Sequence, residues 1–366
     1  MKRLFFITIL LFFNVSIFSS NYNIRRSENF SSDEEMFHNR WTNNMRGDSL
    51  NCTVVGGVFN GPDYTVFVVD TISYIGDGRY FCIFNIKNAA NPELLGKIKL
   101  PSIVQNVYVK DTIAYIADRY DGIRLINVSY PADPVEIGFY DTGGFAYGVY
   151  VQDTIAYVAD YSDGLRLINI ANPTNPTEIG FYNTGSYALC VYVKDTIAYV
   201  ADEWDGLRLI NVTDPTSPTE ISFYDTEDEA YGVYVKDTIA YVADNWDGLR
   251  LINVSNPANP VEIGFYDTGG FSIDIYIKDT IAYVADYTGG LRLIDVSDPT
   301  NPVEIGFYDT GGYSRDVYVQ ETIAYVAVHF AGLRIIDVSD PTNPTETGFY
   351  DTSDRAKCVY VKAVSY

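Results

Sequence analysis

The chain has 366 residues, of which 47% are hydrophobic and 20% charged, enough to bury a large core. Its formal net charge of −23 at pH 7 excludes nucleic acid as a partner, because a nucleic-acid-binding protein needs basic surface that displaces counterions from phosphates. The 32 tyrosines and 20 phenylalanines favour pleated, half-buried surfaces, so the composition indicates β structure.

The first 20 residues have the pattern of a signal peptide. Lys2 and Arg3 precede an apolar run over residues 4–13, and small serines follow near a plausible cleavage point. The run is shorter than the roughly 20 residues of a membrane-spanning helix, although an N-terminal anchor is the alternative. We therefore expect a protein that is secreted or held at the cell surface, without a transmembrane span after the signal is cleaved.

Residues 21–50 are polar and mixed in charge, which predicts a flexible leader. The rest of the chain, residues 51–366, is the predicted folded domain.

A repeat of about 42 residues organises that domain. An acidic residue before Thr-Ile or its equivalent recurs at intervals of 41 residues once and then 42 residues five times. The seven positions are Asp70, Asp111, Asp153, Asp195, Asp237, Asp279 and Glu321. A fixed period of about 40–50 residues is typical of propellers when each unit carries four strands.

Each unit has room for four short strands, called A to D here. In one unit they are expected at residues 147–152, 154–160, 165–170 and 177–183. Glycine, proline and aspartate separate them, with Asp163-Gly164 suited to the positive φ of a tight hairpin turn. The pattern predicts antiparallel meanders without helices.

One such meander has two apolar faces and cannot bury them alone. Stacking the units around an axis covers both faces and leaves no long exposed edge. A linear solenoid is the alternative, but it needs polar capping repeats, and no distinct cap is evident. The predicted fold is an all-β propeller of seven blades, each with four antiparallel strands.

The ends of the array leave its closure open. Strand A occurs an eighth time at residues 357–362, and the chain ends where strand B would continue. One interpretation is a chain truncated at its C-terminus. Residues 52–58 are a candidate for an early strand, so either end of the chain is a candidate to close the ring.

The segment Gly290–Thr310, GLRLIDVSDPTNPVEIGFYDT, resembles the LVIVD repeat family. Its strand C core appears here as Leu-Arg-Leu-Ile-Asp-Val, and the first repeat departs furthest from it. The resemblance covers about four-fifths of the chain. It implies a propeller-like architecture on secreted or surface proteins, with no established activity and no catalytic residues.

Aromatic side chains mark one predicted rim. In an antiparallel A-B-C-D meander the B–C and D–A turns fall on the same rim, and acids accompany the aromatic residues there. Trp and Tyr commonly anchor binding sites, so this rim is the candidate site for a protein or carbohydrate ligand, with blade packing as the alternative. The candidate residues are Tyr120, Tyr161, Trp204, Trp246, Tyr287 and Phe330.

A second pattern pairs the end of strand B with the start of strand C. Five repeats carry Asp at the first place and Arg at the second, which predicts a ladder of structural ion pairs, with an anion-binding ring around the channel as the alternative. The pairs are Asp118 with Arg124, Asp160 with Arg166, Asp202 with Arg208, Asp244 with Arg250, and Asp286 with Arg292. Val328 replaces the Asp in the last repeat, which leaves Arg334 without this partner.

Motifs for chemistry are scarce. The chain has two histidines, no nucleophile elbow and no phosphate loop, so we assign no catalytic residue, no metal and no cofactor. The preferred hypothesis is a non-enzymatic binding propeller. The alternatives are a secreted hydrolase or lyase using channel carboxylates and a purely structural surface-layer or assembly protein. An enzyme would need an acid or histidine at the channel that the other blades lack, and His329 is the candidate.

The four cysteines form no metal-binding pattern. Cys52 and Cys82 are candidates for a disulfide, whereas Cys190 and Cys358 occupy one repeat position and are expected to be buried thiols.

Overall fold

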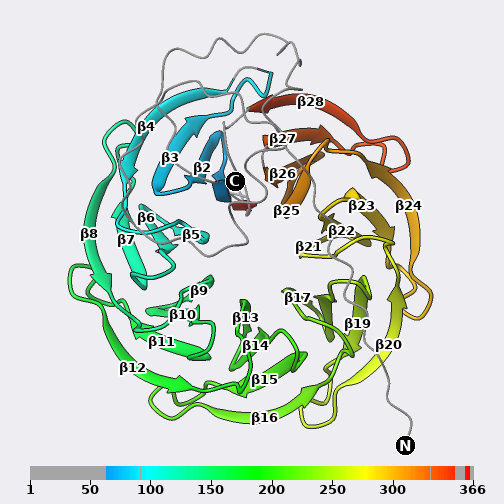
Figure 1. Ribbon diagram of the computed structural model, residues 1–366, viewed down its shortest axis with the longest axis horizontal. Helices are drawn as coiled ribbons and strands as arrows, with labels where there is room; N and C mark the ends of the chain where they lie inside the picture. Colours follow the sequence, from blue (N-terminus) through cyan, green and yellow to red (C-terminus); the bar gives the residue numbers. More distant parts are fainter. Residues whose placement is uncertain (1–62, 91, 330, 351–358, 363–366) are drawn as a thin grey trace, which may run out of the picture. The chain divides into compact units, whose positions relative to one another are not determined.

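The computed structural model describes residues 63–90, 92–329, 331–350 and 359–362. They form seven radial blades of four antiparallel strands each, and the sheet of the first blade gains a fifth strand that pairs in parallel. This arrangement confirms the predicted seven-bladed propeller (Figure 1). The described residues include no helix long and apolar enough to cross a membrane. The predicted signal peptide and leader lie outside these residues.

Each blade uses four consecutive strands, from A nearest the axis to D at the periphery. The A strands are β1 (Asp63–Val69), β5 (Asn106–Lys110), β9 (Gly148–Gln152), β13 (Cys190–Lys194), β17 (Gly232–Lys236), β21 (Asp274–Lys278) and β25 (Tyr313–Gln320). The B strands are β2 (Ile72–Asp77), β6 (Ile113–Ala117), β10 (Ile155–Ala159), β14 (Ile197–Ala201), β18 (Ile239–Ala243), β22 (Ile281–Asp286) and β26 (Ile323–His329). The C strands are β3 (Tyr80–Asn85), β7 (Ile123–Asn127), β11 (Leu165–Asn169), β15 (Leu207–Asn211), β19 (Leu249–Asn253), β23 (Gly290–Asp295) and β27 (Gly332–Asp337). The D strands are β4 (Glu93–Lys99), β8 (Val135–Tyr140), β12 (Thr177–Tyr182), β16 (Thr219–Tyr224), β20 (Val261–Tyr266), β24 (Val303–Tyr308) and β28 (Thr345–Tyr350).

The turns explain why the repeat folds this way. In the third blade, β9 to β12, the A–B turn places Asp153 at φ 52° and the B–C turn places Gly164 at φ 73°. Both values lie in the left-handed region, which Asp tolerates and Gly adopts freely. Strand D carries a β-bulge between the partners of Leu167 and Ile168. The expected strands of this unit are each found to within one or two residues.

The hydrophobic core lies between blades and is repeated around the ring. At one interface, Ile123 and Leu125 of β7 pack with Val149 of β9 and Val158 of β10, all almost fully buried. Both faces of each sheet are thus covered by its neighbours, and small Ala156 in β10 lets the sheets approach.

Polar bonds also join neighbouring blades. The Thr142 hydroxyl, in a D–A loop, donates to Oδ1 of Asp160 in the next blade at 2.6 Å. Nearer the axis, Lys110 Nζ donates to the Asp153 carbonyl of the next blade at 2.8 Å. From the second blade to the sixth, neighbouring blades are thus joined by polar bonds both at the D–A loops and at the A–B turns.

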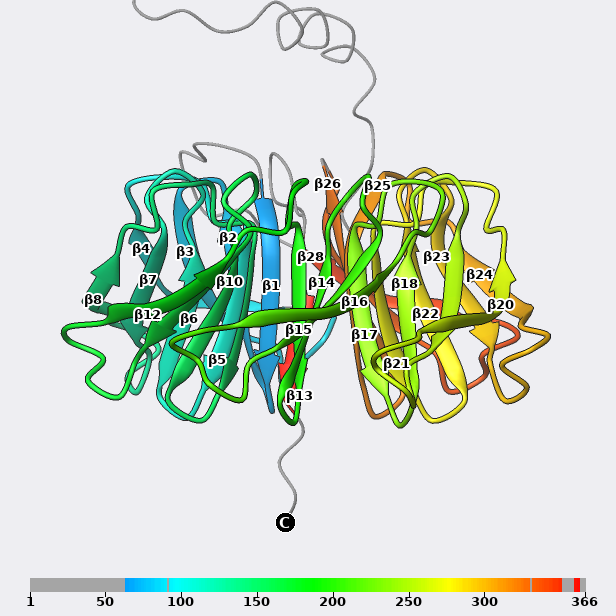
Figure 2. The same cartoon turned by 90° about the horizontal axis from the view of Figure 1, so that it is seen from below.

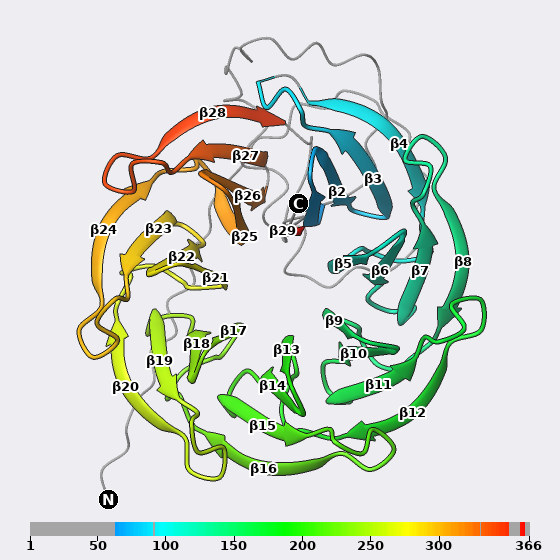
Figure 3. The same cartoon turned by 180° about the vertical axis from the view of Figure 1, so that it is seen from behind.

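The ring closes by packing the seventh blade on the first. Val68 of β1 and Phe84 of β3 share a buried cluster with Ala327 of β26 and Ile335 of β27. A further strand, β29 (Val359–Lys362), runs parallel to β1 in the first blade's sheet, with Tyr360 opposite Phe67 (Figure 3). The eighth copy of strand A therefore joins the first blade from the C-terminal end. The candidate early strand at 52–58 lies outside the described residues.

A Cβ at Gly138 of β8 is expected to destabilise the interface with the next blade. It would lie 2.1 Å from the Pro173 carbonyl oxygen of the neighbouring C–D loop. In the fourth blade Ser222 occupies this place, and its hydroxyl donates to the Pro257 carbonyl at 2.5 Å. We expect Gly138→Ala to lower the free energy of unfolding by about 1–3 kcal/mol, and Gly138→Ser to cost less. Chemical denaturation would measure both, and equal losses would show that the hydroxyl bond contributes nothing.

Candidate functional site

The B–C turns and D–A loops share one rim, here called the aromatic rim. Tyr161, in a B–C turn, stacks on Tyr187, in a D–A loop, with ring centroids 4.0 Å apart and planes 2° apart. Figure 2 shows the blades edge-on, with the turns of all blades gathered at the two ends of the ring. The A–B turns and C–D loops form the opposite rim.

The predicted rim aromatics occupy two different places in the turn. Tyr120, Trp204 and Trp246 are the second residue after the aspartate that follows strand B, and are 53%, 62% and 63% exposed. Tyr161 and Tyr287 are the first residue after the strand B aspartate. Phe330 lies outside the described residues. The aromatic residues of the B–C turns therefore do not form one ring of equivalent positions.

Several of these aromatic side chains also pack on their neighbours. Tyr287 stacks on Tyr313 with ring centroids 4.2 Å apart, and Trp246 contacts Phe271 edge-on with ring centroids 3.9 Å apart. Trp246 nevertheless stays mostly exposed. Packing thus accounts for the first turn position better than for the tryptophans.

The first turn position breaks the symmetry of the ring. It takes a left-handed conformation in five successive blades and is bridged to the segment that leads into the next A strand, although its residue type changes from blade to blade. The five residues are Arg119, Tyr161, Glu203, Asn245 and Tyr287. A non-glycine residue at positive φ is uncommon, and at each of these five residues a β-bridge ties the backbone in place.

Charges of both signs meet at the mouth of the channel on this rim. Burial raises the pKa of Glu203 to about 7, and the nearby carboxylate of Glu229 adds to the shift. Glu229 in turn accepts a 2.8 Å hydrogen bond from Asn245 Nδ2. Burial also raises the pKa of Tyr147, on which the charges of Arg119 and Glu203 both act. The mouth of the channel on the aromatic rim is therefore polar, and its charges differ from blade to blade.

The structure brings together the Asp and Arg of all five predicted pairs, with Arg Nε to Asp Oδ2 distances of 3.3–3.7 Å. The five aspartates are fully buried. Each arginine also reaches a strand D glutamate, such as Glu220 at 3.2 Å from Arg208, and covers a strand D phenylalanine, such as Phe223 at 4.8 Å. The arginines lie on the third strand from the axis, so this geometry fits a ladder within the blades and not a ring around the channel.

The last blade shows how the ladder changes when Val328 replaces the aspartate. Arg334 keeps a partner in Glu346 at 3.5 Å and lies 4.9 Å from the centre of the Phe349 ring. His329, the expected symmetry-breaking residue, is buried at the end of β26 with its ring 5.8 Å from that of Tyr313.

A cavity of about 210 Å³ lies on the axis, between the A strands of blades two to seven. Six tyrosines at the same place in these strands line it, with neighbouring ring centroids 4.4–5.3 Å apart. They are Tyr108, Tyr150, Tyr192, Tyr234, Tyr276 and Tyr318. Burial raises the pKa of Tyr150, and its hydroxyl hydrogen bonds to that of Tyr192.

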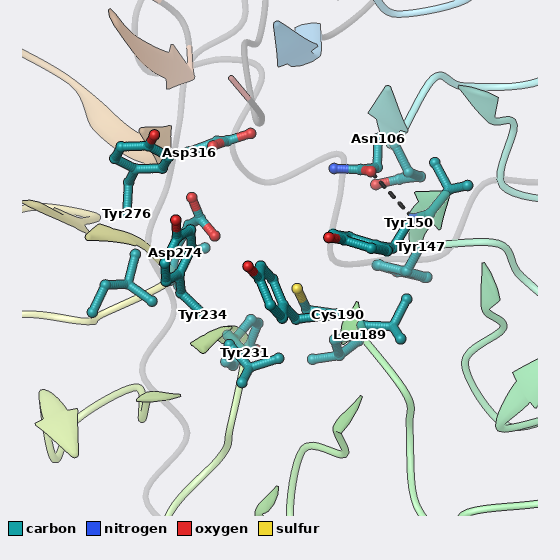
Figure 4. Close-up of a pocket in the computed structure, with 18 of the residues that line it drawn as sticks. Asn106, Tyr147, Tyr150, Leu189, Cys190, Tyr231, Tyr234, Asp274, Tyr276 and Asp316 are labelled. Carbon is teal, nitrogen blue, oxygen red and sulfur yellow. Dashed lines mark hydrogen bonds between the residues drawn. The ribbon is translucent and has the colours of Figure 1, made fainter. Parts of the chain in front are cut away.

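Two acids interrupt the repeat inside this cavity. Asp274 and Asp316 occupy one position on neighbouring A strands, and their carboxyl groups hydrogen bond to each other. Figure 4 shows them across the cavity from Asn106 and Tyr150. Cys190 also lines the cavity and is only half-buried, so the expected buried thiol is wrong here. Cys82 is buried in the core, and Cys52 and Cys358 lie outside the described residues.

A family model described as the LVIVD repeat matches the chain six times, at residues 102–142, 143–184, 185–226, 229–268, 269–310 and 311–352. The matches cover well over half of the sequence. The chain belongs to the LVIVD repeat family. The matched residues begin after the first blade, whose strand C departs furthest from the other LVIVD repeats.

Solved structures show the same fold at low sequence identity. The computationally designed Ika8 protein is similar with a TM-score of 0.64 and 8% identity, over 81% of this chain and 90% of that protein. A functionally unknown protein from Desulfotomaculum acetoxidans has a TM-score of 0.62 and 10% identity, over 76% and 94%. Sqt1 of Saccharomyces cerevisiae has a TM-score of 0.61 and 8% identity, over 80% and 87%. No curated protein matches the chain.

The sequence alone does not identify the acid pair, because the repeat does not tell which position of strand A faces the axis. The residue two places before the cavity tyrosine in successive LVIVD repeats is Asn106, Gly148, Cys190, Gly232, Asp274 and Asp316. This variation is visible in the sequence. It gains meaning only once strand A is known to face the axis.

Proposed function

We propose that this LVIVD repeat protein is an exported, non-enzymatic binding module that engages a protein or glycan through its aromatic rim. The apolar run at residues 4–13 after Lys2 and Arg3 supports export to the outside or to the cell surface. The net charge of −23 is compatible with neutral or basic ligands and opposes acidic ones.

The exposure of Trp204 and Trp246 carries this proposal. Both side chains stay more than 60% exposed, although the same place in other blades is filled by Ser162 or Thr288. The fold thus does not need tryptophan there. A planar aromatic ring beside a turn acid suits stacking on a sugar ring or anchoring a protein partner.

The hydrolase alternative gains little support from the acids of the cavity. Glycosidase carboxyl groups stand about 5–9.5 Å apart, to leave room for the sugar or for water. Asp274 and Asp316 hydrogen bond directly, which places them closer than either arrangement. A binding role is therefore the better-supported function.

The test compares ligand capture by the exported protein with that of two variants. Glycan arrays and pulldowns from cell-surface material would be screened with the unaltered chain and with Trp204→Ala/Trp246→Ala. Loss of a captured ligand by at least about tenfold is expected, since two anchoring rings are removed. The control is Tyr130→Ala, a 77% exposed aromatic on the opposite rim. Full binding by the double variant would refute the aromatic rim as the site.

A further inference from the structure

The cavity on the axis has features of a ligand site that the fold does not require. Six of the seven A strands line it, and its lining is mostly apolar tyrosine ring with a few polar groups. A concave, aromatic-lined space with convergent polar groups is typical of a small-molecule site. It is separate from the exposed tryptophans of the aromatic rim.

The carboxyl group of Asp274 is not needed for its structural bond. Asp274 Oδ2 accepts a hydrogen bond from the Val317 amide of the next blade at 3.2 Å. In the second blade Asn106 Oδ1 accepts the same bond from Val149, also at 3.2 Å. A neutral amide therefore serves this role, and the acid at 274 supplies a charge beyond it.

The second acid makes the pair. Asp316 is 3% exposed and hydrogen bonds to Asp274. Two carboxylates hydrogen bond only when one holds a proton, so the pair carries about one negative charge. Burial raises the pKa of Asp274, which agrees with a shared proton. A buried negative charge facing a cavity favours a cationic group in the ligand.

Donors line the same cavity. Gln105 is only 6% exposed, and its Nε2 is buried without a hydrogen-bond partner among the described residues. Arg315 also lines the cavity, with its guanidinium carbon 4.5 Å from the centre of the Tyr287 ring. An amide N–H and a guanidinium both suit an anionic acceptor such as a carboxylate.

We propose that the central cavity binds a free amino acid as its zwitterion. The ammonium group would donate to Asp274 and Asp316, and the carboxylate would accept from Gln105 and Arg315. An apolar side chain would lie against the tyrosine rings. Negative and positive groups in the cavity are thereby both satisfied, which an amine or an acid alone does not achieve.

The first test is a thermal-shift screen of the full chain with each standard amino acid at millimolar concentration, followed by calorimetry on those that raise the Tm. For the amino acid that binds best, the matching amine without the carboxylate and the matching acid without the ammonium are then compared. Both are expected to bind at least about tenfold more weakly than the zwitterion. A folded protein that no amino acid stabilises would overturn the proposal.

Variants assign the two ends of the ligand. Asp274→Asn/Asp316→Asn keeps amides like Asn106 and should weaken the amino acid and the amine about tenfold, but not the acid. Arg315→Gln should weaken the amino acid and the acid, but not the amine. The matched control is Asp298→Asn/Asp340→Asn, in C–D loops where other repeats carry asparagine. Equal effects of the control and the cavity pair would contradict the assignment.

The proposals for the aromatic rim and for the central cavity can be disproved independently. Trp204→Ala/Trp246→Ala should leave amino-acid affinity unchanged, because neither tryptophan lines the cavity. Ca²⁺ binding that is abolished by Asp274→Asn/Asp316→Asn, without any amino-acid binding, would replace the zwitterion by a metal ion and overturn the proposal.

Discussion

Replacing Arg208 by methionine is expected to lower the free energy of unfolding by about 3–5 kcal/mol. Arg208 holds the fully buried Asp202 with Nε at 3.4 Å and contacts Glu220 and Asp205 with its two other nitrogens. Methionine keeps an apolar contact with Phe223 but leaves Asp202 without its cation. Urea unfolding at about pH 8, where a proton least relieves the orphaned carboxylate, would show the full loss.

The last blade supplies a matched control for this loss. Arg334 covers Phe349 as Arg208 covers Phe223, but Val328 stands in place of the buried aspartate. Its remaining ion pair is with the partly exposed Glu346. Arg334→Met is therefore expected to cost about 1 kcal/mol or less. Equal losses at the two arginines would mean that stacking on phenylalanine, and not the buried charge, is what the arginine contributes.

The repeat makes the fold predictable from the sequence alone. A 42-residue period with four apolar segments leaves few ways to cover both sheet faces, and the ring is one of them. The Asp–Arg pairs could also be predicted from the sequence. Antiparallel pairing of strands B and C places Val158 opposite Arg166 and so brings Asp160 near this arginine. The closure of the ring was harder to predict from the sequence, because it depends on which end of the chain reaches the first blade.

The functional surface was harder to predict, because single residues decide it. Tyr161 and Trp204 both follow strand B, one residue apart in the turn, yet the first lies at positive φ and stacks while the second is exposed. Aromatic composition does not distinguish these places. Backbone conformation does, and a turn of several residues does not reveal its φ angles through residue type alone.

The acid pair in the cavity was also hard to predict from the sequence. Asp274 and Asp316 stand where Gly148 and Gly232 stand in other blades. Because glycine has no side chain, the glycines do not show whether this position of strand A faces the axis. Only the assembled ring shows that this position faces the axis, and hence that two acids in neighbouring repeats meet.

Lowering the pH from about 8 to about 5 is expected to raise the Tm by about 5 °C. Burial raises the pKa of Asp202 from 3.8 to about 6 and that of Asp244 to about 7. Between the ordinary and the raised value the folded chain holds protons that the unfolded chain has lost. The resulting stability is complete below about pH 4 and is lost as the pH rises through 6 to 7.

The net charge of −23 acts in the same direction, because self-repulsion grows as carboxyl groups ionise. High salt screens that repulsion but hardly reaches the fully buried aspartates, so a pH dependence that persists in salt belongs to them. Asp202→Asn still accepts the Thr184 hydroxyl but does not titrate, and its Tm should change less between the two pH values. A Tm that instead climbs from pH 5 to pH 8 would show that the arginines keep these carboxylates charged, because the pair attraction would then outweigh the cost of burial.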